Sequence, residues 1–211
     1  MKRLSVAFIL LIACVIAFPA TTADVAIRKL REAYSSVFSF SGSITIKIGS
    51  KTYSGTIKYK VPNKLKISFY SPSVIDMISD GTSIWIYIKG NNTVIKQPIL
   101  SKKGGKLIYA SEVINPYEKY DNEYIIVLDK YDDKTFSFTL KAKPDVFTTF
   151  STAKLIAYKS GLISSISGIT ITRESLSIEI KYTGVNINID DREFFFTPPA
   201  DAQVLADIFQ E

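Results

Sequence analysis

The sequence predicts a mainly β protein with a few helices, in which one large antiparallel sheet curls around its own apolar face. First, most of the chain after residue 40 alternates apolar and polar residues with the period of two expected for strands with one buried face. Second, turn sequences such as Asp80-Gly81 and Thr183-Gly184 separate these runs, so neighbouring strands are antiparallel. Third, helical patterns cover only about thirty to forty residues, too few to cover about eleven strands, so the sheet must curve to bury its own face.

The elements follow in order along the chain. Residues 25–37 are predicted to form an amphipathic helix, because Ile27, Leu30 and Val37 lie near one face at helical spacing. Residues 98–121 show no period of two and are predicted to be short helices and loop that cross the sheet, and a last short helix is expected near 201–209. The alternating runs that predict strands lie at 43–48, 56–61, 65–69, 84–88, 136–140, 176–182 and 185–189, with weaker runs near 93–97, 123–129, 153–159, 162–171 and 193–196.

The composition indicates a globular protein and excludes most familiar catalytic sites. The 211 residues are 46% hydrophobic and 22% charged, a balance that disordered and collagen-like chains do not show. Histidine is absent and Cys14 is the single cysteine, which excludes His-ligated zinc, Cys-cluster metal sites and Ser-His or Cys-His nucleophiles. We therefore expect no enzyme activity, no cofactor and no metal site.

Residues 1–23 are predicted to be a signal peptide. Two basic residues precede an uncharged run over 4–18, which is short for a helix that crosses a hydrocarbon core of roughly 30 Å. Thr21 and Ala23 are small residues at the two positions that a signal peptidase reads, so cleavage is expected before Asp24. Residues 24–211 then form a single domain that is periplasmic or secreted.

A lipid anchor is the alternative for the N-terminus. The segment Leu11-Ile12-Ala13-Cys14 resembles a lipobox, in which Cys14 would be lipidated and become the mature N-terminus. The residues after Cys14 continue the apolar run, whereas a lipoprotein usually continues into a polar tether. Cleavage before Asp24 is therefore the favoured hypothesis.

The charge pattern argues against a nucleic-acid partner. Loss of the signal peptide would lower the formal net charge from +6 to about +4, which is only mildly basic. Basic residues do not cluster with aromatic residues on one face, as nucleic-acid binding requires. They alternate along strands instead, which predicts a solvated outer sheet face that carries Lys58, Lys60, Lys64 and Lys66.

Three segments resemble, in order and spacing, motifs of the LolA-like periplasmic lipoprotein carriers. They are Lys60-Val61-Pro62-Asn63-Lys64-Leu65, then Ser79-Asp80-Gly81-Thr82-Ser83-Ile84-Trp85-Ile86-Tyr87, and finally Phe194-Phe195-Phe196-Thr197-Pro198-Pro199. The family pattern is a strand that ends in Pro-Asn, a Ser-Asp-Gly turn that opens a Leu-Trp-Tyr strand, and a closing Phe-x-Phe-x-Pro-Pro. The resemblance extends over residues 24–211.

The resemblance implies an incompletely closed β-barrel with a helical lid over an apolar cavity that takes the acyl chains of a lipoprotein. The expected partners are acylated lipoproteins or other lipids, an inner-membrane ATP-driven exporter, and an outer-membrane receptor or acceptor membrane. The carrier would be a periplasmic monomer. A lipid-binding sensor or interaction module of the same fold is the alternative, since fold alone does not determine function.

On each strand, the alternate positions that carry apolar residues are predicted to line the cavity. Leu65, just after Pro-Asn, corresponds to a bulky apolar position near the cavity mouth in the family. The lid would consist of Ile27 and Leu30 in the N-terminal helix and of the region 99–108 with Leu107. The predicted cavity residues are Ile44, Ile46, Ile57, Tyr59, Leu65, Ile67, Phe69, Ile84, Ile86, Phe136, Phe138, Ile178 and Ile180.

The chain departs from the family at Val61. The best-known members carry an arginine immediately before Pro-Asn, aimed at backbone carbonyls of the lid, so the latch of this chain is altered. Because Ile57 and Tyr59 are expected to face inward, Val61 is expected to do so as well.

Two other classes of function are compatible with the residues. A surface interaction protein would leave the cavity filled with side chains. A hydrolase would need an acid and a base, but the candidate carboxylates lie at strand ends beside turn residues, where solvated acids are expected. These carboxylates are Asp132 and Asp133, and Asp190, Asp191 and Glu193.

Overall fold

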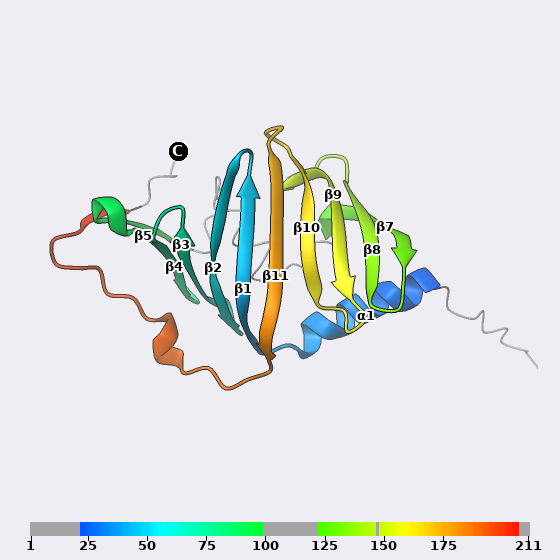
Figure 1. Ribbon diagram of the computed structural model, residues 1–211, viewed down its shortest axis with the longest axis horizontal. Helices are drawn as coiled ribbons and strands as arrows, with labels where there is room; N and C mark the ends of the chain where they lie inside the picture. The colour runs from blue at the N-terminus through cyan, green and yellow to red at the C-terminus, as the bar shows by residue number, and fades with distance from the viewer. Residues whose placement is uncertain (1–21, 99–121, 147, 207–211) are drawn as a thin grey trace, which may run out of the picture.

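The computed structural model describes residues 22–98, 122–146 and 148–206. The chain opens with helix α1 (Thr22–Ser36) and then forms a single curved sheet (Figure 1). In the described part, no helix is long and apolar enough to cross a membrane. The strands are β1 (Ser39–Ile48), β2 (Lys51–Lys60), β3 (Lys64–Ser71), β4 (Ile75–Asp80), β5 (Ser83–Ile88), β6 (Thr93–Pro98), β7 (Tyr124–Tyr131), β8 (Thr135–Ala142), β9 (Phe150–Tyr158), β10 (Ile163–Thr170), β11 (Ser175–Val185) and β12 (Gln203–Ala206), with the 3-10 helices η1 (Lys89–Asn91) and η2 (Asp191–Phe194).

The sheet has 12 strands in the order β12-β6-β5-β4-β3-β2-β1-β11-β10-β9-β8-β7. Consecutive strands within 39–98 and within 124–185 pair as antiparallel neighbours, and β1 joins the two groups by pairing with β11. The short strand β12 adds in parallel to β6. Because β12 and β7 are edges at opposite ends, the sheet does not close into a barrel, which agrees with the incomplete closure that the family resemblance implies.

The two faces of the sheet differ in what covers them. We call the face that packs on α1 the inner face. Ala26 and Leu30 of α1 are buried in one apolar cluster with inner-face residues of β1–β3 and β7–β11. Several members, among them Ile57, Phe138 and Leu155, have no exposed surface at all. Each such side chain contributes about 1.5–3 kcal/mol of hydrophobic stabilisation, so the cluster is the main core of the fold.

The structure corrects the sequence interpretation around the last long strand. The predicted turn at Thr183-Gly184 is wrong, because β11 continues to Val185 and Gly184 pairs with Ser41 of β1 at a bulge. Pairing along β1 overrides the local turn preference of these residues. The strand predicted at 185–189 is also wrong: Asn186 has a φ of 55° and donates its backbone N–H to Ser39, which turns the chain away from β11.

Two further corrections concern the C-terminal part. Residues 193–196 are not a strand, because Asp190 accepts a hydrogen bond from the backbone N–H of Arg192 and caps the 3-10 helix η2. The helix expected near 201–209 is instead strand β12 over its described part. The edge of β6 supplies backbone partners there, and the local sequence does not reveal them.

Strand β4 was not predicted from the sequence. Its Ile78 is buried on the outer face, so the strand lacks the strict alternation of apolar and polar residues.

Candidate functional site

The inner face brings the predicted cavity residues together. All of them are buried except Ile86, which is half-buried. Across the β1–β11 pair, Ile44 lies opposite Ile180 and Ile46 opposite Ile178. The same parity continues across β2 and β3, and on β8 the rings of Phe136 and Phe138 lie 6.3 Å apart. The alternate strand positions that the sequence predicts to face inward are therefore the buried ones. A role of these residues in ligand binding stays a prediction.

Helix α1 covers the inner face in the region of β7 to β11. Leu30 is 1% exposed, and Ile27 packs partly buried against the same cluster. The helix approaches the β9–β10 turn so closely that a Cβ atom at Gly161 would collide with the carbonyl oxygen of Lys29. Gly161 also has a φ of 89°, which favours glycine. The helical part of the predicted lid thus contacts the predicted cavity residues, whereas Leu107 and the region 99–108 lie outside the described residues.

An aromatic group stands near the centre of the inner face. The ring of Phe40 stacks on Tyr59 at 5.1 Å and meets the edge of Tyr182 at 5.3 Å. Tyr182 donates its hydroxyl hydrogen to the carbonyl oxygen of Ile163 over 2.8 Å. Burial raises the pKa of Tyr59, which further favours the neutral form of its hydroxyl.

Polar groups interrupt the inner face in one row. Leu65 lies opposite Ser79, Ser79 opposite Ile84, and Ile84 opposite Gln97, so these four side chains share the inner face across β3 to β6. Ser79 donates its hydroxyl hydrogen to the carbonyl oxygen of Asn63 over 2.6 Å. Gln97 is 6% exposed, and among the described residues its side-chain nitrogen has no hydrogen-bond partner. From the sequence, Ser79 was recognised only as the start of the Ser-Asp-Gly turn motif, and nothing in the pattern distinguished Gln97 from an ordinary strand residue.

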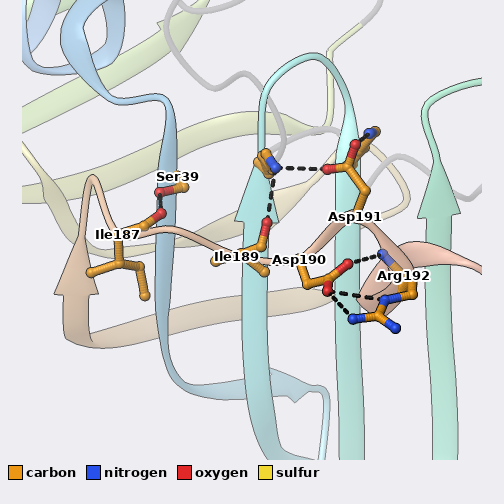
Figure 2. A network of polar contacts seen from close by, with 8 residues as sticks. Ser39, Ile187, Ile189, Asp190, Asp191 and Arg192 are labelled. Atoms are coloured by element: carbon orange, nitrogen blue, oxygen red, sulfur yellow. Dashed lines mark hydrogen bonds and ion pairs between the residues drawn. The ribbon is translucent and has the colours of Figure 1, made fainter.

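The outer face of β2 to β6 is covered by residues 186–202, which we call the C-terminal strap (Figure 1). The strap is held by ion pairs: Asp191 contacts Lys60 at 2.6 Å and Lys64 at 2.8 Å. Lys60 also donates to the carbonyl oxygen of Ile189 over 2.8 Å. Figure 2 shows Asp191 turned toward this contact and Asp190 turned toward Arg192. The lysines lie on the outer face as predicted, but their charges are paired with the strap and not simply solvated.

Glu193 and two aromatic residues fasten the rest of the strap. Glu193 contacts Lys58 at 3.1 Å and Lys66 at 3.3 Å. Phe194 is 1% exposed, and the ring of Phe196 lies 5.8 Å from that of Trp85. Phe196 also lies 5.7 Å from the ring of Tyr87, so the Phe-x-Phe motif packs on the outer face of β5.

Val61 does not face the interior, so that expectation is wrong. Its side chain is 43% exposed, and its backbone N–H donates to the carbonyl oxygen of Phe38 over 2.9 Å. Strand β2 ends at Lys60, and the chain turns through Asn63, which has a φ of 58°. Once the strand has ended, its period of two no longer determines where the next side chain points.

Among the carboxylates considered for hydrolysis, those whose pKa is shifted have a lowered pKa, which favours the charged form. A hydrogen bond from Lys60, together with one from Lys64, lowers the pKa of Asp191 to about 2. The guanidinium of Arg192 lowers the pKa of Asp190, and hydrogen bonds from turn N–H groups lower that of Asp132. A general acid needs a raised pKa, which these groups do not have. Within the ranges that the structure describes, no group of three or more potential His, Cys, Asp or Glu metal ligands occurs.

An open groove of about 530 Å³ lies on the outer face over β1 and β8 to β11. Lys47 and Lys154 contribute to its walls, and small residues make up much of its lining. The sequence did not reveal this groove, because outward Ser and Thr residues are also typical of an ordinary solvated sheet face. The lining residues are Lys47, Gly49, Thr139, Thr152, Ala153, Lys154, Ser167, Gly168, Ile169, Ser175, Leu176 and Ser177.

Comparisons with known proteins agree with this architecture. The family model of the outer membrane lipoprotein carrier protein LolA matches residues 39–197. A relative in Francisella tularensis subsp. novicida (strain U112), named outer-membrane lipoprotein carrier protein, is 23% identical over 210 residues, with 97% of each chain covered. The fold is similar to that of an uncharacterized conserved protein from Thermus thermophilus, with a TM-score of 0.56, 8% identity, and 86% of this chain and 96% of that chain covered. It is also similar to MucB, with a TM-score of 0.53, 11% identity, and 87% of this chain and 65% of MucB covered. The chain belongs to the outer membrane lipoprotein carrier protein LolA family.

Proposed function

We propose that this protein is a periplasmic carrier that buries the acyl chains of lipoproteins against its inner face and moves them from the inner to the outer membrane. The observation that carries the proposal is the extended apolar surface on the inner face of a sheet that does not close, in a chain whose residues 39–197 match the carrier family. No catalytic step is needed. The work is the reversible burial of hydrocarbon.

The energetics make such a carrier necessary for acylated cargo. Each buried methylene group contributes about 0.8 kcal/mol, so a chain of about sixteen carbons gains on the order of 12 kcal/mol from burial. An acylated protein therefore leaves a membrane readily only if another apolar surface receives its chains. The inner face of β1–β3 and β7–β11 supplies such a surface, which includes isoleucine, leucine and phenylalanine side chains.

We propose that α1 is the element that makes way for the cargo. In the described part of the chain it is the helix that packs on the inner face, and Leu30 and Ala26 occupy the surface that an acyl chain would contact. A helix can move away as a unit without breaking the strand pairing beneath it. Loading by an inner-membrane ATP-driven exporter, and delivery to an outer-membrane receptor or acceptor membrane, complete the proposed cycle.

A photo-crosslinking experiment tests where acyl chains bind. The mature chain is incubated with a synthetic triacylated lipopeptide that carries a diazirine in one acyl chain, and the labelled peptides are identified by mass spectrometry. We expect labels on inner-face residues of β2, β3, β5 and β8, and competition by unlabelled lipopeptide but not by the deacylated peptide. Labels confined to the outer groove near Ile169, or no label at all, would contradict the proposal.

Two matched variants sharpen the test. Ile86 is half-buried on the inner face and Ile169 is 47% exposed in the outer groove, so glutamate at either position is tolerated better than at a fully buried site. Ile86→Glu is expected to reduce labelling, because a carboxylate on an apolar binding face is costly to desolvate. Ile169→Glu is expected to leave labelling unchanged.

A further inference from the structure

The strongest unexplained feature of the inner face is the side-chain amide of Gln97. The residue is 6% exposed, and within the described part of the chain its Nε2 atom has no hydrogen-bond acceptor. Buried side-chain polar atoms nearly always have a partner, because an unpaired buried donor costs about 1–3 kcal/mol. A leucine or methionine of similar size would fill the same space without this cost. The amide is therefore a donor available to a ligand.

The strand register places this donor on the proposed binding face. Gln97 lies opposite Ile84 on β5, and the row continues through Ser79 to Leu65 on β3. The next row on the same face runs through Ile67, Met77, Ile86 and Ile95. Gln97 thus lies beside this apolar row, one residue before β6 ends at Pro98.

Ser79 provides a contrast within the same row. Its hydroxyl donates to the carbonyl oxygen of Asn63, and its oxygen accepts the backbone N–H of Gly81 over 3.3 Å. Ser79 is therefore occupied by the turn that it supports. A buried water needs two to four polar partners, and beside Gln97 the row offers the apolar Ile84 and the occupied Ser79.

We propose that Nε2 of Gln97 donates a hydrogen bond to the carbonyl oxygen at the head of a bound acyl chain and so fixes how deeply the chain enters. This inference rests on the proposed function. An amide N–H is a neutral donor, and the ester or amide carbonyl that joins an acyl chain to its carrier group is a neutral acceptor at one end of a hydrocarbon. With the carbonyl at Gln97, the chain extends along the row that contains Ile86 and Ile67.

The test compares two ligands that differ only at the carbonyl. Methyl palmitate carries the acceptor, and hexadecyl methyl ether replaces C=O by CH₂ at the same position. Both are titrated into the wild-type mature chain, Gln97→Met, and the control Gln203→Met, in which the altered glutamine is exposed on β12. Palmitate is a third ligand. If Gln97→Met weakens the binding of palmitate more than that of methyl palmitate, the acceptor is a free carboxylate and the ester assignment is overturned.

We expect the ester-to-ether affinity ratio to fall by about 2- to 13-fold in Gln97→Met and to stay unchanged in Gln203→Met. The carbonyl stretch of ¹³C-labelled ester should lie at lower frequency when bound to the wild type than when bound to Gln97→Met. The melting temperature of ligand-free Gln97→Met should be unchanged or higher, since the variant loses no hydrogen bond from Nε2 to a described residue. A clear drop would show that Gln97 has a structural partner and would overturn the inference.

The remaining outcomes separate this inference from the proposed function. If the wild type binds both ligands and the ratio is the same in Gln97→Met, the donor role is wrong while acyl-chain binding stands. If neither ligand binds and the lipopeptide does not label the inner face, the proposed function is wrong and this inference falls with it.

Discussion

The two halves of the sheet are covered on opposite faces. Strands β8 to β11 carry α1 on the inner face and have an open groove on the outer face beside Lys154. Strands β2 to β6 carry the C-terminal strap on the outer face, with Phe194 buried beneath it. The first half is held by apolar contacts of a helix, whereas the second is held by two aromatic side chains and a set of ion pairs. From this comparison we infer that the two covers differ in what holds them: burial of apolar side chains holds the helix, whereas aromatic contacts and ion pairs hold the strap.

The largest expected effect is in the half under α1. Phe138 has no exposed surface, so Phe138→Ala removes a ring from the main core and leaves a cavity. We expect the free energy of unfolding, measured by urea denaturation, to fall by about 3–5 kcal/mol. Ile169→Ala on the open outer face should change it by less than about 1 kcal/mol. Similar losses for both variants would contradict the assignment of inner and outer faces.

A smaller and more local effect is expected in the half under the strap. Phe194→Ala removes the buried anchor of the strap, so residues 187–206 should exchange their amide hydrogens faster while β8 and β9 keep their protection. Hydrogen exchange followed by mass spectrometry measures this directly. If protection falls equally throughout the sheet, the strap is part of the main cooperative unit and the two covers do not differ as we infer.

The strap is also expected to respond to acid. The pKa of Asp191 is about 2 in the folded chain, below its ordinary value of 3.8, because Lys60 and Lys64 donate to it. A lowered folded-state pKa stabilises the fold above the ordinary value, and this stabilisation is lost as pH falls from about 4 toward 2. Glu193 is shifted in the same direction by Lys58 and Lys66, which lower its pKa.

The single tryptophan reports this change. Trp85 packs against Phe196 of the strap, so its fluorescence emission should shift to longer wavelength as the strap loosens below about pH 4. In Asp191→Asn the part of the shift that depends on this carboxylate should be missing. A transition with the same midpoint and size in both proteins would assign the acid response to other groups.

The smallest effect is expected at Val61, which lies at the turn after β2. Its side chain is 43% exposed, so Val61→Arg should change the free energy of unfolding by less than about 0.5 kcal/mol. Any slowing of lipid release in this variant would then reflect a restored latch and not a change of core stability. Hydrogen exchange of residues 98–121 in both proteins is the measurement, and equal protection would mean that the arginine does not latch that segment.

The sequence by itself determined the inner face, because burial of one strand face forces a period of two. The predicted cavity residues from Ile44 to Ile180 all lie on that face, and Ile27 and Leu30 lie on the helix that covers it. The three family motifs were equally recognisable, since a turn such as Asp80-Gly81 depends on local hydrogen bonds from Thr82 and Ser83 to the carboxylate of Asp80.

Only the tertiary structure decided what covers each face and where pairing overrides local preference. Gly184 stays in β11 because β1 supplies partners from a distant part of the chain, and β12 is a strand because β6 offers a free edge beside it. Asp191 and Glu193 resemble solvated turn acids until the strap folds back over the lysines of β2 and β3. The burial of the Gln97 amide likewise follows from its neighbours across β5 and β4. Contacts between residues far apart in the chain leave no periodic signal, so the pattern of a single strand could not reveal them.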